Sequence, residues 1–149
     1  MPASTTSFLF PDINVWIALS FDGHVHHSIA ADWFESLGPD SRFFFCRFTQ
    51  LGLLRLLSSD VVMGGALVRN QIQAWGIYDD WLRDDRISLL EEPPELDRLF
   101  RAHSRHKRPA PKDWADSYLS AFAAASNLSI VTFDRSLARK SSPSLLLAP

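Results

Sequence analysis

Residues 113–134 read DWADSYLSAFAAASNLSIVTFD, a helix pattern that leads directly into a short buried strand. The apolar positions between Ala115 and Ala123 recur at helical spacing, and Asn127 is a residue type that often ends a helix. Residues 129–133 form a continuous apolar run, which is typical of a strand covered on both faces. This helix–strand unit predicts a parallel sheet with helices packed against it.

The same alternation continues through the rest of the chain. Apolar runs predict further strands at residues 8–12, 43–45, 86–90 and 145–147. Helical spacing predicts helices over residues 13–20, 26–37, 49–58 and 66–83, and one that starts at residues 93–94 and runs through Phe100. No repeat or linker divides the pattern. We therefore expect one α/β domain over residues 1–149, with a parallel sheet of four to five strands and a short disordered tail at residues 1–7.

Composition restricts the class of protein. The chain has 149 residues, 46% hydrophobic and 21% charged, which suits one soluble domain with a real core. No apolar stretch approaches the roughly 20 residues that span a bilayer, and the first residues lack a secretory signal pattern. Cys46 is the single cysteine, so no internal disulfide forms. These features favour a cytoplasmic protein with no membrane partner.

Acidic side chains stand where predicted strands end. Asp12 and Asp134 each end an apolar run, and Asp116 lies in the first turn of the helix before the last of these strands. Ligands of open parallel sheets bind outside the carboxyl ends of the strands. Carboxylates gathered there make a site for a hard divalent cation, and hence for phosphate chemistry.

Each acid also has a purely structural interpretation. Asp12 and Asp134 stand where a helix N-cap is expected, and Asp113 with Asp116 forms a favourable cap and first-turn pair. Taken singly, capping is the more common role of such residues. Their joint placement favours a metal site, because unpaired carboxylates brought together raise one another's pKa unless a cation neutralises them. The metal set is therefore Asp12, Asp116 and Asp134, with Asp113 as a further candidate and Asn14 and Thr132 as supporting residues.

Charge is unevenly distributed, although the net charge is only −2. Eight of the seventeen acids lie in residues 79–97, and a stretch with six of the fifteen Lys and Arg residues and no acid follows at residues 98–112. This stretch is either a solvated helix end and loop or a surface that contacts phosphates. The candidate phosphate-contacting residues in it are Arg98, Arg105, Lys107, Arg108 and Lys112.

Histidine and tryptophan carry weaker signals. His24, His26 and His27 lie close together in the sequence but lack further cysteine or histidine partners at zinc-site spacing, so a loop and a helix start are favoured over zinc. The five tryptophans fall mostly at core-facing helical positions and are interpreted as packing residues rather than as a base-stacking platform.

Three segments together resemble the PIN-domain ribonucleases, and within them the VapC-type toxins of toxin–antitoxin pairs. They are residues 10–19 (FPDINVWIAL), 111–123 (PKDWADSYLSAFA) and 130–135 (IVTFDR). The likeness extends over nearly the whole chain. The first segment is a weak signal alone, whereas the second and third in this order and spacing are specific.

The resemblance implies a PIN-like three-layer sandwich and Mg²⁺- or Mn²⁺-dependent cleavage of RNA. The family's acidic positions correspond to Asp12, Asp116 and Asp134, and a metal-activated water would attack the phosphodiester bond. The resemblance also implies a cognate antitoxin that covers the active cleft, and a homodimer. The RNA target is not encoded in any recognisable motif.

One departure from the family concerns the helix after the second strand. The family commonly has a glutamate there, whereas residues 49–55 read TQLGLLR, so either Gly52 or the amide of Gln50 takes the acidic position. A non-catalytic PIN fold that binds RNA or protein is the resulting alternative. A phosphatase of the haloacid-dehalogenase type is disfavoured, because that family has a second aspartate where Asn14 stands.

Overall fold

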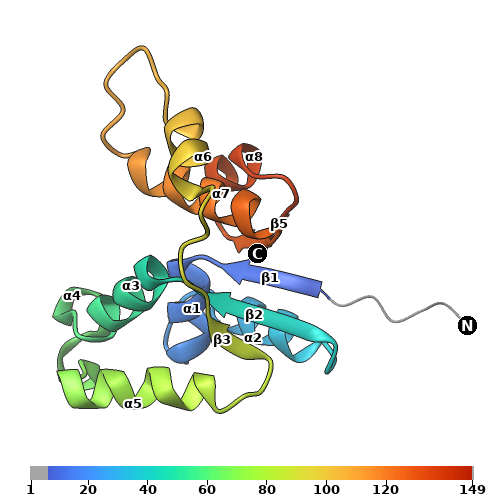
Figure 1. The fold of residues 1–149 in the computed structure, drawn as a ribbon. Helices are drawn as coiled ribbons and strands as arrows, with labels where there is room; N and C mark the ends of the chain where they lie inside the picture. The colour runs from blue at the N-terminus through green and yellow to red at the C-terminus, as the bar shows by residue number, and fades with distance from the viewer. Residues whose placement is uncertain (1–6, 149) are drawn as a thin grey trace, which may run out of the picture.

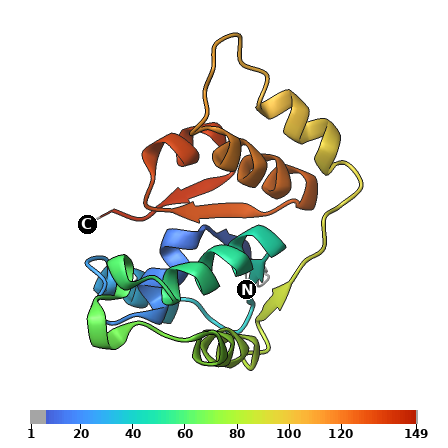
Figure 2. The same cartoon turned by 90° about the vertical axis from the view of Figure 1, so that its left-hand side faces the viewer.

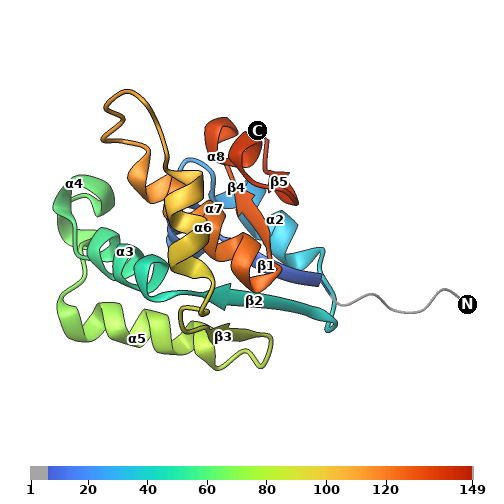
Figure 3. The ribbon, with the colours of Figure 1, turned by 45° about the horizontal axis from the view of Figure 1, so that its top comes forward.

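The computed structural model describes residues 7–148 and contains one five-stranded parallel sheet. Its strands lie in the order β3-β2-β1-β4-β5, which Figure 3 shows from the lower edge to the upper edge. The strands are β1 (Ser7–Pro11), β2 (Ser41–Phe45), β3 (Ile87–Leu89), β4 (Ser129–Thr132) and β5 (Ser144–Leu146). The predicted α/β sandwich with a central parallel sheet of four to five strands is confirmed.

Helices cover both faces of this sheet (Figures 1 and 2). One group consists of α1 (Ile13–Ser20), α2 (His27–Glu35), α3 (Arg47–Leu57), α4 (Asp60–Met63), the 3₁₀ turn η1 (Gly65–Leu67) and α5 (Gln71–Leu82). The other group consists of α6 (Leu96–His103), α7 (Trp114–Ser126) and α8 (Arg135–Lys140). A long connection, residues 104–113, projects from the second group between α6 and α7.

Alternation along the strands produces two separate cores. Leu9 and Val131 pack with α1, α2, α3 and α5, whereas Phe10 and Ile130 pack with α6, α7 and α8. Trp16 is fully buried in the first core, where its ring stacks on Phe45 with centroids 4.0 Å apart. The continuous apolar runs in the sequence follow from this burial on both faces.

The order of the strands places a switch point between β1 and β4. After β1, the chain adds β2 and β3 on one side, and it then returns to the other side of β1 to add β4 and β5. The register pairs Leu9 with Ser129 and Pro11 with Val131, so the carboxyl ends of these two strands lie side by side. Ligands bind at such points in open α/β sheets.

Several predicted boundaries differ from the structure. Ser7 begins β1 and does not belong to a tail, while residues 1–6 lie outside the described part of the chain. The helix predicted from residue 66 starts at Gln71, because Asn70 forms a capping box with Gln73. Asn127 does end α7, in the left-handed conformation with φ 57°. Between residues 7 and 148, no helix is long and apolar enough to cross a membrane.

Candidate active site

Asp12 is a buried carboxylate at the carboxyl end of β1. It caps α1, because its Oδ1 accepts a hydrogen bond from the Val15 N–H at 3.1 Å. Its Oδ2 accepts a second hydrogen bond from the Thr132 hydroxyl, which comes from the neighbouring strand β4. Burial raises the pKa of Asp12 from 3.8 to about 6, although these hydrogen bonds oppose the rise. An ionised Asp12 is therefore costly unless a cation joins it.

Thr132 links Asp12 to Asp134. Its hydroxyl donates to Asp12 and accepts the Asp134 N–H at 2.9 Å. The Asp134 carboxylate caps α8 by accepting the Ser136 N–H at 2.8 Å, and the residue is exposed. Thr132 thus fixes the backbone of one acid and the side chain of another.

Asp116 is the third acid, in the first turn of α7. The side chain is partly buried, and burial is the main cause that raises its pKa. The negative charge of Asp134 is the next cause, and the same charge also raises the pKa of Asp12. Asp134 is therefore electrostatically coupled to both of the other acids, which come from β1 and α7.

These acids do not form a closed ligand cage as they stand. Among the residues between 7 and 148, no three His, Cys, Asp or Glu side chains are arranged so that they could hold a metal ion together. Capping and clustering are combined, since Asp12 and Asp134 act as caps and also repel acidic neighbours. All three donors are carboxylate oxygens, which suit a hard cation that keeps several waters.

Asp113 takes part in a different structure. Its carboxylate accepts hydrogen bonds from Lys140, from His106 and, at 2.8 Å, from the Ser117 hydroxyl. The Lys140 ammonium is the main cause that holds the pKa of Asp113 below its usual range, followed by His106. Its side chain does not cap α7, contrary to the structural interpretation of the sequence. Because these partners engage its carboxylate, Asp113 is not among the metal-binding residues that we propose.

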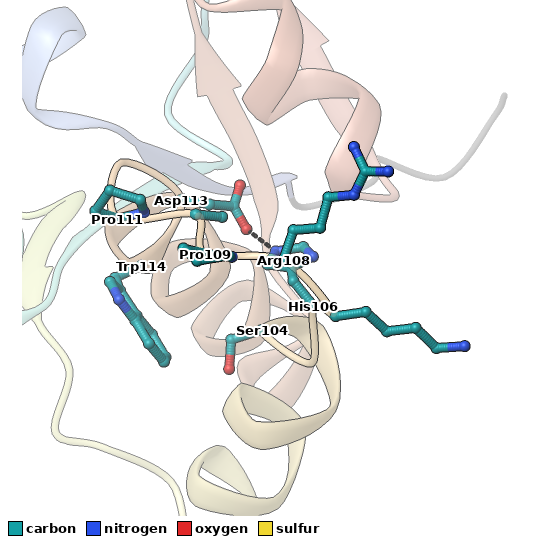
Figure 4. Close-up of a pocket in the computed structure, with 9 residues that line it drawn as sticks. Ser104, His106, Arg108, Pro109, Pro111, Asp113 and Trp114 are labelled. Carbon is teal, nitrogen blue, oxygen red and sulfur yellow. Dashed lines mark hydrogen bonds and ion pairs between the residues drawn. The ribbon is translucent and has the colours of Figure 1, made fainter.

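The residues around Asp113 form a clamp, which we define as Asp113, His106, Lys140 and Ser117. It ties the connection between α6 and α7 to the end of α8. Figure 4 shows the contact between Asp113 and His106 within it. The backbone of Lys140 is held as well, because its carbonyl accepts the Ser120 hydroxyl at 3.0 Å. No local spacing in the sequence reveals this clamp, since Lys140 lies 27 residues after Asp113.

The predicted RNA-binding residues all lie on the surface. Arg98 is on α6, and Arg105, Lys107, Arg108 and Lys112 are on the connection over residues 104–113, named the basic loop from here on. The clamp anchors the basic loop at His106 and Asp113, between which Lys107 and Arg108 project. Lys112 and Asp116 line one cavity of about 500 Å³. The loop therefore places cations next to an acid of the site.

Polar residues near the site have mixed roles. Asn14 is exposed on the first turn of α1. Gln50 is buried, and its side-chain oxygen accepts a hydrogen bond from the Arg47 guanidinium at 2.6 Å. His26 stacks on Phe133, directly before Asp134, with ring centroids 4.5 Å apart. The sequence pattern of the clustered histidines did not predict this stacking contact, which lies next to Asp134.

Gly52 faces Ile13, the residue after Asp12. A Cβ atom at Gly52 would lie 2.2 Å from Cδ1 and 2.6 Å from Cγ1 of Ile13, far inside van der Waals contact. The Ile13 side chain thus fills the space beside α3 that a longer residue at position 52 would enter. Neither Gly52 nor Gln50 supplies a carboxylate on this side of the site.

Gly52→Ala is expected to destabilise the fold by about 1–2 kcal/mol, although alanine is the better helix former. The overpacking against Ile13 outweighs the gain in helix propensity. Thermal unfolding would measure it, with Gly76→Ala as the control, because a Cβ at Gly76 on α5 meets no atom within 4 Å. Recovery of stability in Ile13→Ala/Gly52→Ala would locate the strain, and an unchanged Gly52→Ala protein would refute it.

Comparison with known proteins shows the family of the chain. The family model described as PIN domain matches residues 9–142, which include all three acids. The chain belongs to the PIN-domain family. Ribonuclease VapC41 of Mycobacterium tuberculosis is 41% identical to this PIN domain over 129 residues, which cover 85% of this chain and 88% of that protein. The prediction of a VapC-type PIN ribonuclease is confirmed.

Solved structures share the PIN fold at low sequence identity. The VapC20 toxin of Mycobacterium tuberculosis, which cleaves the sarcin-ricin loop, has a TM-score of 0.65 and 16% identity, covering 88% of this chain and 93% of its own. VapBC2 of Rickettsia felis, solved with a promoter DNA fragment, also has a TM-score of 0.65 and 16% identity, covering 94% and 96%. At this identity, the two structures support the fold alone.

Proposed function

We propose that this PIN domain is a metal-dependent endoribonuclease and the toxin of a toxin–antitoxin pair. The observation that supports this most directly is that Asp12 and Asp134 follow the neighbouring strands β1 and β4, while Asp116 on α7 lies close enough to feel the charge of Asp134. Asp12, Asp116 and Asp134 come from three separate elements, and the charge of Asp134 acts on both of the others. A negative charge that raises the pKa of two neighbouring carboxyl groups favours a bound cation.

Asp12 and Asp116 would hold the ion, Mg²⁺ or Mn²⁺, and Asp134 would add negative charge beside it. A bound divalent ion of this kind supplies Lewis-acid activation of water and neutralises charge on the phosphoryl group. Thr132 keeps the Asp12 carboxylate in place while Val15 holds its other oxygen. The fixed position of Asp12 lowers the reorganisation that ligand binding requires.

RNA is the substrate that the surroundings of the acids favour. Arg105, Lys107 and Arg108 project from the basic loop, and Lys112 shares a cavity with Asp116. Lysine and arginine side chains contact the phosphate backbone without reading its sequence. These residues, together with Arg98, would hold the strand while the acids act on one phosphate.

The proposed protein partner is a cognate antitoxin, by analogy with VapC-type relatives such as the VapBC2 assembly. A homodimer in the cytoplasm is the proposed form of the chain. Co-purification from cells that express the chain together with its genomic neighbour tests the antitoxin, and sedimentation of the free chain tests the dimer.

A second candidate function is a PIN fold that binds RNA or protein without cutting it. The close packing of Gly52 on Ile13 favours it, because this side of the site lacks a carboxylate. Calorimetric titration with Mn²⁺ separates the two functions, since a module that only binds RNA needs no ion.

The test of the proposed function is cleavage of structured RNA by the purified chain. We expect cutting in Mg²⁺ or Mn²⁺, none in EDTA, and inhibition by the co-expressed antitoxin. Failure to cut any structured RNA, combined with no heat of Mn²⁺ binding, would leave the second candidate.

A further inference from the structure

Trp114 is the most exposed tryptophan that the structure describes outside the core. The residue is 59% exposed, although it is the first residue of α7, a helix whose later residues are well packed in the core. Its ring meets Phe100 nearly at right angles, with an interplanar angle of 78° and centroids 6.1 Å apart. An edge contact of this kind leaves much of an indole free. The interpretation of all five tryptophans as packing residues does not hold for Trp114.

Trp114 lines two adjoining cavities at the foot of the basic loop. One cavity, of about 390 Å³, is also lined by Phe100 and by the charged residues Asp97, Arg101 and Arg105. The other, of about 530 Å³, lies between Trp114 and the inner side of the loop, which includes His106 and Pro109. Figure 4 shows the indole directed away from the contact between Asp113 and His106. The Trp114 indole therefore lies between the two cavities and is not covered by a neighbouring side chain.

Basic side chains outnumber acidic ones around this aromatic face. Arg105 is exposed in the first cavity, and Lys107 and Arg108 border the second. Asp113, at the end of the loop, forms an ion pair with Lys140 and accepts a hydrogen bond from His106. Asp97, which lines the first cavity, forms an ion pair with Arg101. Exposed aromatic rings combined with basic residues are the usual elements of a binding site for single-stranded nucleic acid.

The hollows connect Trp114 with the proposed catalytic acids. The cavity of about 530 Å³ shares Ala110, Pro111 and Asp113 with the cavity that contains Asp116. Trp114 and Asp116 are two residues apart on one helix, so their side chains point to different sides of α7. A strand that passes from one to the other would run along the base of the basic loop.

The clamp fixes this surface before any ligand binds. Asp113 is held by α8 through Lys140, and His106 brings the far part of the loop onto the same carboxylate. The Ser117 hydroxyl adds a third contact from α7. A loop anchored at both ends loses less conformational entropy on binding than a free one.

We propose that Trp114 is a stacking subsite for a nucleobase of single-stranded RNA, beside the nucleotide whose phosphate lies at the acids. This inference rests on the proposed RNA substrate. The indole stacks on the base, and Arg105 with the cations of the basic loop contacts the adjoining phosphates. Stacking is tolerant of sequence, because every base has an aromatic face. Trp114 therefore contributes affinity and the position of the strand, and it takes no part in bond cleavage.

Binding of a short, fluorescein-labelled single-stranded RNA of mixed sequence tests this subsite. Anisotropy is measured in EDTA, where no metal-dependent cleavage occurs. Trp114→Ala is expected to weaken binding about 10- to 100-fold, and Trp114→Phe by only a few-fold, because phenylalanine retains an aromatic face. Trp75→Ala is the matched control, since Trp75 is 45% exposed on α5, in the other helical group, and its loss should leave the affinity unchanged.

An RNA of the same length with abasic positions separates stacking from charge. Wild type and Trp114→Ala are expected to bind it equally, because no base remains to stack. An equal loss on both RNAs would overturn the inference, as would unchanged binding by Trp114→Ala or no binding by the wild type. Sedimentation of each variant identifies the remaining outcome. In that case Trp114 is a contact between copies of the chain, and the affinity for RNA falls only because the copies dissociate.

The same measurements distinguish this subsite from the proposed function. RNA binding that depends on Trp114, without any cleavage in Mg²⁺ or Mn²⁺, would retain the subsite and remove the nuclease. Cleavage by a protein in which Trp114→Ala changes nothing would do the opposite.

Discussion

Asp12→Asn is expected to melt at a higher temperature than the wild type at pH 7.5 without metal. The same variant is expected to cut RNA more slowly, by about 100-fold or more. The asparagine oxygen still caps α1, since asparagine is as good an N-cap as aspartate. The buried charge is removed, however, and with it the cost that raises the pKa of Asp12 to about 6. The loss of cleavage follows from the loss of an anionic ligand that would hold the metal ion.

The sign of the stability change follows from the pKa. The folded protein holds the Asp12 proton more tightly than the unfolded chain, whose value is 3.8, so stability falls as the pH rises from about 4 to 6 and is level above that. At 1.36 kcal/mol per pKa unit, ionising Asp12 in the folded protein costs at most roughly 3 kcal/mol. Placing an amide against the Thr132 hydroxyl reduces the gain from removing this charge by about 1 kcal/mol. We expect a net gain of about 1–2 kcal/mol.

Thermal melts in EDTA between pH 4 and 8 would measure this gain. The difference between the variant and the wild type should grow up to about pH 6 and then remain constant. Added Mn²⁺ should stabilise the wild type and leave Asp12→Asn unaffected. Asp32→Asn, an exposed aspartate on α2, is the control for the loss of one charge. A variant that melts lower than the wild type at pH 8 would show that the ionised carboxylate is not a burden.

Asp116→Asn is expected to abolish cleavage in Mg²⁺, by about 100-fold or more, while RNA binding in EDTA is retained or slightly tighter. The acid lies beside Lys112 in the cavity next to the basic loop, so a neutral side chain there weakens repulsion of the phosphates. Calorimetry should show weaker Mn²⁺ binding, because the ion loses a ligand and a charge.

The contrast between cleavage and binding is decisive for Asp116. A variant that cuts RNA at the wild-type rate would remove Asp116 from the site and with it the proposed mechanism. A variant that loses RNA binding in EDTA to the same extent as cleavage would make Asp116 a structural residue. The Asp32→Asn protein again serves as the reference for both measurements.

Local patterns predicted most of the strands and the position of the acids. Strand runs such as that of Phe10 and Ile130 are apolar because both faces of the sheet are covered, so burial is visible in the sequence itself. The carboxyl ends of parallel strands lie at the same edge of a sheet. This rule alone predicts that Asp12 and Asp134 lie near each other.

Tertiary partners could not be predicted in the same way. Asp113 has the spacing of a helix cap, yet Lys140 and His106 determine where its carboxylate lies. The exposure of Trp114 depends on the course of the basic loop, which no periodicity describes. Short elements such as α4 were also missed, because four residues are too few to show a helical period.

The hydrogen bond between Asp12 and Thr132 joins residues that are 120 positions apart. During synthesis the amino-terminal half emerges first, with β1 and Asp12 in it, while β4 and the two later acids are still to be translated. A growing chain therefore holds one carboxylate without its companions. If the three acids act together as proposed, cleavage of RNA begins only after the carboxyl-terminal part of the domain has emerged and folded.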